Sequence, residues 1–176
     1  MLGLGSSLAH PVFPFHPVHS VSSAVMQMWL RNNVNIIEDQ WNDSSGQGNH
    51  VHQGTADDQA TISKGGYHFT PEDHYDFTNP IQIASGEGLS IFLVVDIDNY
   101  DTQNTIFGIG ATTEFLEFQT AARIRVRVDV ATDVIDYGAG AFAAGSKMLI
   151  SIFRKSGGTG EFTLHKNGVA LTGTAT

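Results

Sequence analysis

The segment from Arg123 to Val130 alternates without interruption between charged and apolar side chains. Its odd-numbered positions are charged and its even-numbered positions are branched aliphatic residues: Arg123, Arg125, Arg127 and Asp129 against Ile124, Val126, Val128 and Val130. Successive side chains of a β-strand point to opposite faces of the sheet. The segment is therefore predicted to be a strand with one face in a core and the other in contact with solvent.

Shorter segments of strand character follow one another from Val25 onward, and no stretch shows a sustained helical period. Leu89–Ile97 is the strongest, and its run Ile91–Val95 predicts a strand buried on both faces. Asn167-Gly168 separates two such segments and is the dipeptide preferred in a two-residue hairpin turn. Many short strands joined by polar turns predict an all-β sandwich or jelly roll with at most one short helix. The other expected strands are Met26–Leu30, Tyr67–Phe69, Thr105–Ile109, Phe115–Gln119, Val134–Tyr137, Lys147–Arg154, Phe162–Lys166 and Val169–Thr172.

Residues 1–24 are predicted to form an extended arm outside the sheets. Their prolines lack the amide hydrogen that a central strand donates, and each favours extended backbone at the residue before it. The apolar side chains of the arm, which would pack along its own domain or on a neighbouring subunit, are Val12, Phe13, Phe15 and Val18. A loosely ordered tail is the alternative. Its histidines could form a pH-sensitive contact; they are His10, His16 and His19.

The composition excludes several classes of function. A net charge of −9 argues against general binding to nucleic acid or anionic membranes, because phosphate contacts need clustered cations. The absence of cysteine excludes disulfides, zinc–thiolate sites and thiol catalysis. The first basic residue is Arg31, so the N-terminus does not read as a secretory signal peptide. No apolar run is long enough to span a bilayer. We therefore expect a protein made in a cytoplasm, without nucleic acid or an inserted membrane as partner.

Four segments occur in an order typical of one domain family. Met28–Leu30 and the polar, glycine-punctuated Trp41–Asn49 come first, Phe69–Tyr75 follows, and Leu164–Val169 contains the Asn-Gly hairpin. Over roughly residues 25 to 172 the chain resembles the laminin-G-like domains of the concanavalin A-like lectin/glucanase superfamily, as found in phage virion structural proteins. The resemblance implies a jelly-roll β-sandwich of two antiparallel sheets.

With this resemblance, the domain is assigned to residues 25–176, behind the arm of residues 1–24. In the third motif Pro71 replaces a glycine of the family pattern and His74 an acidic residue. The family continues past the hairpin with further strands, so either the last strands are missing or a neighbouring molecule completes the sheet. An open sheet edge tends to recruit another strand. The opening Met1–Ser6 also resembles the start of small virion proteins of marine and cyanobacterial phages.

The carboxylates do not form the pattern that catalysis on this fold would need. Glucanases place two acids on one strand face, about 5 Å apart. Glu114 and Glu117 are three residues apart, which sends them to opposite faces of a strand. Asp96 and Asp98 share a face, but they lie at a strand end and turn. We therefore expect no enzymatic activity.

Two groups of residues could bind a metal ion. Glu72, Asp73 and Asp76 supply hard oxygen ligands near one turn, which suits calcium; a solvated acidic loop is the alternative. His50 and His52 would share one strand face, as in some transition-metal sites, or would be ordinary surface histidines. No other cofactor is implied.

Two further groups could bind a ligand. Arg123, Arg125 and Arg127 could hold an acidic sugar or an acidic neighbour, because guanidinium groups form two-point contacts with carboxylates. The alternative is a solvent face paired with acids of adjacent strands, which the acidic composition favours. Trp29 and Trp41 could stack on sugar rings, whereas the resemblance implies that they lie in or near the core.

These observations predict a non-enzymatic phage virion structural protein. A capsid decoration or cement protein held by the arm is the leading form, assembled in the host cytoplasm and located in the virion. A tail or fibre component, or a carbohydrate-binding module for host surface glycan, is the alternative. The expected partners are other virion proteins of the capsid or tail and further copies of the chain, because an arm and an open sheet edge both favour association.

Overall fold

The structure, a computed structural model, describes residues 26–32, 34, 36–63, 66–79, 81, 87–100, 104–108, 115–128, 131–155 and 162–175. The chain divides into two compact units, Met1–Ile81 and Gln82–Thr176. Over the described residues the fold is all-β, every pair of neighbouring strands is antiparallel, and no α-helix occurs. The expected all-β class is therefore confirmed. No helical turn in this part of the chain is long and apolar enough to cross a membrane.

The first unit consists of very short strands. One antiparallel sheet has the order β1-β2-β3-β6, with β1 at Ile36–Ile37, β2 at Gln40–Trp41, β3 at Val51–His52 and β6 at Asp76–Phe77. A separate hairpin joins β4 (Thr61–Ser63) to β5 (Gly66–His68), and a 3-10 turn, η2, spans Ala56–Asp58. Strands of two or three residues bury little apolar surface, and the buried apolar side chains described in this unit are Val51 and Ala60.

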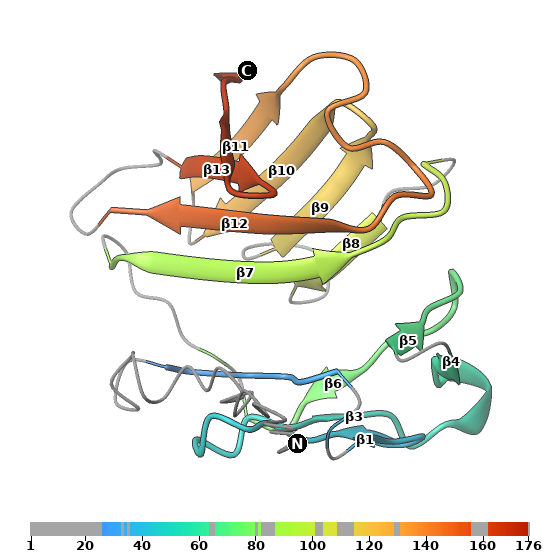
Figure 1. Cartoon of the computed structure of the whole chain (residues 1–176). Coiled ribbons are helices and arrows are strands. Elements are labelled where there is room, and N and C mark those ends of the chain that lie inside the picture. The colour runs from blue at the N-terminus through green and yellow to red at the C-terminus, as the bar shows by residue number, and fades with distance from the viewer. Residues whose placement is uncertain are drawn as a thin grey trace, which may run out of the picture. The chain divides into compact units, whose positions relative to one another are not determined.

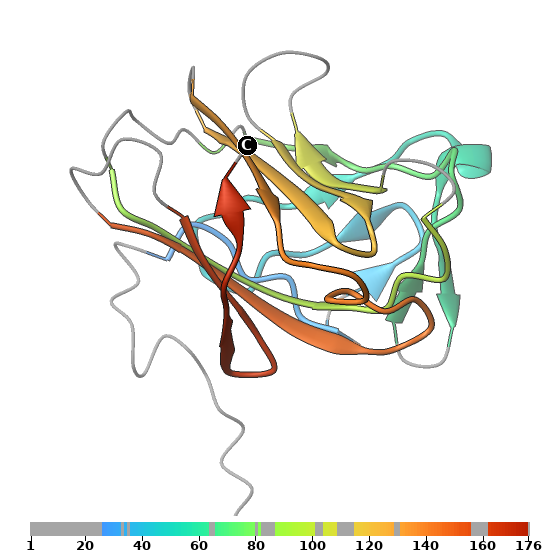
Figure 2. The same ribbon diagram turned by 90° about the horizontal axis from the view of Figure 1, so that it is seen from above.

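The second unit contains two longer sheets that pack face to face. The five-stranded sheet has the order β15-β11-β10-β9-β8, and the four-stranded sheet has the order β14-β13-β12-β7. Figures 1 and 2 show the strands of the five-stranded sheet crossing over β7 and β12 of the four-stranded sheet. The strand bounds are β7 (Leu89–Val95), β8 (Asn104–Gly108), β9 (Phe115–Thr120), β10 (Arg123–Val128), β11 (Ala131–Asp136), β12 (Met148–Arg154), β13 (Phe162–Lys166), β14 (Val169–Leu171) and β15 (Thr174–Ala175).

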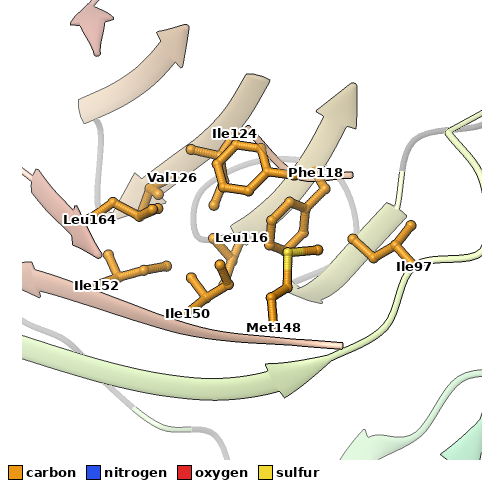
Figure 3. Close-up of a cluster of buried hydrophobic side chains, with 10 residues drawn as sticks. Ile97, Leu116, Phe118, Ile124, Val126, Met148, Ile150, Ile152 and Leu164 are labelled. Carbon is orange, nitrogen blue, oxygen red and sulfur yellow. The ribbon is translucent and has the colours of Figure 1, made fainter. Parts of the chain in front are cut away.

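The core of the second unit lies between these two sheets. Leu116, Phe118, Ile124 and Val126 project from β9 and β10 toward Met148, Ile150 and Ile152 of β12, as Figure 3 shows. Ile97, Phe142 and Leu164 complete this group of ten buried side chains. The alternation predicted for Arg123–Val130 is confirmed at its two described core positions, because Ile124 and Val126 are buried while Arg123, Arg125 and Arg127 are only partly so.

The Asn167-Gly168 dipeptide forms the predicted hairpin turn between β13 and β14. Both residues have positive φ, 51° at Asn167 and 80° at Gly168, as a type I′ turn requires. The Asn167 side chain also accepts a hydrogen bond from the Leu149 amide at 2.9 Å, which ties the turn to β12. The short β15 was not expected, and it pairs with β11 through Ile135 and Asp136.

Two strand predictions were wrong in instructive ways. Met26–Leu30 forms no regular strand; Leu30 makes an isolated bridge to Asp43 instead. β7 is not buried on both faces, because Phe92 and Val94 are 64% and 68% exposed. The arm of residues 1–24 and its boundary lie outside the described residues, and the division of the chain at Ile81 was not anticipated from the sequence.

Candidate interaction surface

The outer face of the four-stranded sheet carries large apolar side chains in contact with solvent. In the register of β7 and β12, Leu149 lies opposite Val94, and Ser151 opposite Phe92. Their neighbours in the chain, such as Ile150 and Leu93, point the other way, into the core. Leu149 is 40% exposed, beside the more exposed Phe92 and Val94. We call the surface formed by Phe92, Val94, Leu149 and Phe153 the apolar face.

Aromatic contacts order the middle of the apolar face. The rings of Phe92 and Phe153 meet edge to face at 5.5 Å, and Phe153 makes a second edge-to-face contact with His165 at 5.5 Å. Such pairs prefer edge-to-face geometry because the ring edge is positive and the ring face negative. The row runs across β7, β12 and β13, so these side chains are held in place before anything binds to them.

The described strands of this face carry no charged side chain that points outward, and charged side chains lie just beyond the strand ends. The strand positions that point outward hold Ser90, Ser151, Thr163 and Ala170 besides the residues already named, and none is Asp, Glu, Lys or Arg. Asp96, Lys147 and Lys155 are exposed just beyond the strand ends. An apolar centre with a charged rim is the composition of a protein–protein contact surface.

The outer face of the five-stranded sheet differs in being charged and internally paired. Arg123 donates from Nε and Nη2 to the two carboxylate oxygens of Asp136, at 2.6 and 2.8 Å. Arg125 Nη1 lies 3.4 Å from Glu117 Oε2, and the Glu117 side chain is only 5% exposed. The hydrogen bond from Arg123 lowers the pKa of Asp136, and the same contact raises the pKa of Arg123.

Arg123, Arg125 and Arg127, which we call the arginine row, are therefore not all available to bind one acidic ligand. Arg123 and Arg125 already pair with acids of adjacent strands, as the solvent-face interpretation predicted. Arg127 makes no such ion pair in the described chain, and its buried Nε has no hydrogen-bond partner there. A single arginine provides too little to define a binding site for an acidic ligand.

Both tryptophans make contacts with other residues of the first unit. Trp41 packs against Tyr67 with ring centroids 4.5 Å apart, and its Nε1 donates to the Arg31 carbonyl at 2.8 Å. The Arg31 guanidinium lies 4.7 Å from the centre of the Trp29 ring, in a cation–π contact. Both indole rings thus have partners within the chain, in line with a place in or near a small core.

Tyr67 connects Trp41 to Phe69 and Tyr75 in one aromatic cluster. Tyr67 lies 6.0 Å from Phe69 and 5.5 Å from Tyr75, between ring centroids. The Tyr67 hydroxyl donates to the Ile37 carbonyl at 3.1 Å, and the Tyr75 hydroxyl donates to the Glu38 carbonyl at 2.6 Å. Burial, with the charges of Tyr75 and Asp39, raises the pKa of Tyr67 to about 12. Phe69 remains 48% exposed.

The loop Trp41–Asn49 is organised around the carboxylate of Asp43. Its Oδ1 accepts from the amides of Trp29 and Ser45 at 2.7 and 2.9 Å, and its Oδ2 accepts from the Ser45 hydroxyl and the Asn49 amide at 2.6 and 3.1 Å. Burial alone would raise the pKa of Asp43, but the hydrogen bonds from Ser45, Trp29 and Asn49 together lower it. The loop is a structural element held by the four hydrogen bonds to Asp43, whereas the buried Ser44 hydroxyl has no hydrogen-bond partner among the described residues.

The proposed metal ligands are not gathered into a site. Among the described residues no three His, Asp or Glu side chains lie close enough to hold a metal ion, and Glu72, Asp73 and Asp76 are no exception. Asp73 instead accepts a hydrogen bond from the Thr70 amide at 2.6 Å, which closes the turn. His50 is also used internally, because its Nδ1 accepts from the Asp43 amide at 3.0 Å.

Other predicted residues lie outside what the structure describes. Val12, Phe13, Phe15 and Val18 of the arm belong to this group, as does Glu114. Glu117, which the sequence analysis excluded as a catalytic partner of Glu114, is a buried partner of Arg125. Sequence reasoning missed the apolar face, although the continuous run Ile91–Val95 was the signal. The run was interpreted as a strand buried on both faces within one domain. It equally fits a strand with one face in the core and the other available for contact with another molecule.

Comparisons with known proteins identify no relative. No protein-family model matches the chain, and no curated protein or solved structure matches it significantly. The interpretation of the chain therefore depends on its own residues.

Proposed function

We propose that this chain is a non-enzymatic phage virion structural protein, built on a concanavalin A-like jelly roll of laminin-G type. Its leading role is capsid decoration or cement, with residues 1–24 as the anchoring arm and Val12, Phe13, Phe15 and Val18 as apolar contacts. A tail or fibre component is the closest alternative. The observation that supports an assembly role best is the apolar face, with Phe92 64% and Val94 68% exposed.

An apolar face of this kind supports assembly because water contact with it is unfavourable. Covering apolar surface contributes about 25 cal/mol per Å², and contiguous exposed apolar patches on folded proteins commonly mark interaction sites. Along its described strands, the outward positions of the face hold no Asp, Glu, Lys or Arg. Its edge-to-face ring pairs also fix the side chains, which lowers the entropy that binding would otherwise cost.

Protein identification in purified particles tests this function. Particles of the phage that carries the gene are banded on a density gradient, and their proteins are identified and counted by mass spectrometry. We expect the chain in a constant ratio to the major capsid protein, with many copies for a decoration role and few for a tail role. A chain that is abundant in the lysate and absent from the particles would contradict the proposal.

Removal of residues 1–20 tests the anchoring arm. The truncated protein and the full chain are each added to particles that lack the protein, and the bound fraction is measured after sedimentation. We expect the truncated protein to lose most of its binding while its far-UV circular dichroism stays unchanged. Equal binding of the two proteins would show that the arm is not the anchor.

Glycan binding is a second candidate, and Phe69 is the observation that favours it. Phe69 is 48% exposed, and its ring lies 5.8 Å from the Tyr75 ring. The Asp73 carboxylate, two residues before Tyr75, accepts a hydrogen bond from the Thr70 amide. An exposed ring beside polar groups can stack on a sugar. On a glycan array, Phe69→Ala should abolish any binding that the wild type shows, whereas Ile62→Ala, at a site 40% exposed, should not. An array without wild-type binding removes this candidate.

A further inference from the structure

We infer that the apolar face is the contact surface between two copies of this chain, stacked sheet on sheet. Antiparallel sheets with one face on a core normally turn polar side chains outward on the other face. β7 departs from this rule at Phe92 and Val94, and β12 departs from it at Leu149. A second apolar sheet face, about 10 Å away, would cover these three side chains together.

The charge pattern of the apolar face is compatible with a second copy as the partner. Each chain carries a net charge of −9, so two copies repel each other wherever their acidic surfaces meet. The repulsion is weakest where neither surface is charged, and the outward strand positions of the apolar face hold no Asp, Glu, Lys or Arg. A cationic protein would be attracted to the acidic side chains elsewhere instead. Two copies of this uncharged apolar surface can therefore meet without repulsion between like charges.

The rim of the face is compatible with a two-fold contact. In such a contact the same patch occurs on both sides, so the rim must offer groups of both signs to avoid like-charge pairs. Asp96 follows β7, and Lys147 precedes β12 at the same end of the sheet, since Val95 is paired with Met148. Lys155 follows β12 at the other end. Acidic and basic side chains are therefore both present around the apolar centre.

The size of the face sets the expected strength. The strands contain 7, 7, 5 and 3 residues. With a rise of about 3.3 Å per residue and about 4.8 Å between strands, they give a footprint of about 350 Å². Stable complexes bury about 800 Å² per partner. The dimer should therefore be weak and should form as the protein concentration rises through the micromolar range.

A pair of valines provides a matched test of this contact. Val94 and Val169 are 68% and 67% exposed and lie in the same sheet. Val169 pairs with Lys166 on the side of the sheet that carries Leu164, so it lies off the apolar face. Sedimentation equilibrium of the full chain should show a dimer whose dissociation constant rises about tenfold or more in Val94→Lys. Val169→Lys should leave that constant unchanged.

Thiol labelling distinguishes burial of the apolar face by a second copy from burial by other residues of the same chain. The chain contains no cysteine, so Val94→Cys and Val169→Cys each introduce a single thiol. Maleimide labelling at position 94 should slow as the protein concentration rises, while labelling at position 169 should not change. Protection of position 94 at the lowest concentration would assign the cover to other residues of the same chain and overturn the inference.

The inference deepens the proposed function and rests on it only for biological context, so the two can fail separately. A chain that stays monomeric at all concentrations, with position 94 reactive throughout, contradicts the dimer even if the protein is found in virions. A chain that dimerises through Val94 but is absent from particles keeps the dimer and loses the virion role.

Discussion

The two units of this chain are stabilised by different kinds of contact. The second unit buries ten apolar side chains between two sheets, among them Phe118 and Ile150. In the described part of the first unit the buried apolar side chains are Val51 and Ala60, and its loops are held by the Asp43 carboxylate and the rings around Tyr67. The second unit therefore depends on apolar burial, and the first on polar and aromatic contacts.

This difference predicts different responses to solvent conditions. Apolar burial does not depend on pH, whereas hydrogen bonds to a carboxylate disappear when it is protonated. The chain provides separate probes of the two units, because both of its tryptophans, Trp29 and Trp41, lie in the first. Tryptophan fluorescence thus reports the first unit, and far-UV circular dichroism is dominated by the longer strands of the second. We expect the fluorescence transition at the lower denaturant concentration.

The largest effect is expected in the core of the second unit. Ile150→Ala leaves a cavity between the sheets and should lower the free energy of unfolding by about 3 kcal/mol. Ile150 is 0% exposed, while the preceding Leu149 is 40% exposed on the apolar face. Leu149→Ala should therefore cost less than about 1 kcal/mol in the monomer. Urea titrations followed by circular dichroism measure both, and equal losses would contradict the assignment of the two faces.

The next largest effect is expected at Asp43 in the first unit. Asp43→Asn removes the charge from four hydrogen bonds and turns one acceptor oxygen into a donor, which should cost about 2 kcal/mol. The fluorescence transition in urea should shift, and the circular dichroism transition should shift much less. Asp57→Asn, at an exposed position of η2, is the control and should shift neither.

The same carboxylate predicts a dependence on acid. The folded pKa of Asp43 is below its ordinary value of 3.8, so its contribution to stability is complete above about pH 5. The contribution is lost as the pH falls through the lower folded value. Fluorescence should therefore report acid unfolding of the first unit before circular dichroism changes. If wild type and Asp43→Asn lose fluorescence at the same pH, another group controls the acid transition.

A smaller effect distinguishes the two ion pairs of the five-stranded sheet. Arg125→Met leaves the nearly buried Glu117 carboxylate without its ion-pair partner, and we expect a loss of about 1–2 kcal/mol after solvent screening of the partly exposed arginine. Arg123→Met breaks the more exposed contact with Asp136 and should cost less. Urea titrations followed by circular dichroism compare them. A larger loss at Arg123 would show that burial of Glu117 is not the deciding factor.

The sequence was most informative where one face of a strand is buried and the other is not. Arg123–Val128, Phe162–Lys166 and the Asn167-Gly168 turn could be predicted because period and turn chemistry are local properties. The polar loop around Asp43 is part of the family resemblance, and its hydrogen bonds show that it organises the chain locally. The ends of β8 were off by one residue, and β11 begins three residues before its predicted start.

What the sequence could not provide depends on contacts between distant segments. The apolar run Ile91–Val95 indicates that both faces of the strand are apolar, but it does not indicate what covers the face that points away from the core. Glu72, Asp73 and Asp76 are close in sequence, yet backbone hydrogen bonding of the turn uses Asp73 elsewhere. Likewise, arginines at alternate positions predicted pairing with acids of adjacent strands, but not that these acids would be Asp136 and Glu117, because strand register is set by the whole sheet.

The smallest effects provide the sharpest test, because the same chemical change can be made in each unit. The Tyr67 hydroxyl donates to backbone carbonyls in the first unit, and the Tyr100 hydroxyl donates to the Phe142 carbonyl at 2.6 Å in the second. Burial raises the pKa of both phenols to about 12. Because the folded pKa lies above the unfolded value of 10, their contribution to stability is present below pH 10 and is lost as the pH approaches 12.

Each phenylalanine substitution should cost about 1 kcal/mol at neutral pH, the usual worth of one such hydrogen bond. Tyr67→Phe should shift the fluorescence transition alone, and Tyr100→Phe the circular dichroism transition alone. If each substitution shifts both transitions equally, the units unfold together and the difference in their contacts does not make them independent. Separate shifts would show that polar and aromatic contacts suffice to hold a unit whose described part buries two apolar side chains, Val51 and Ala60.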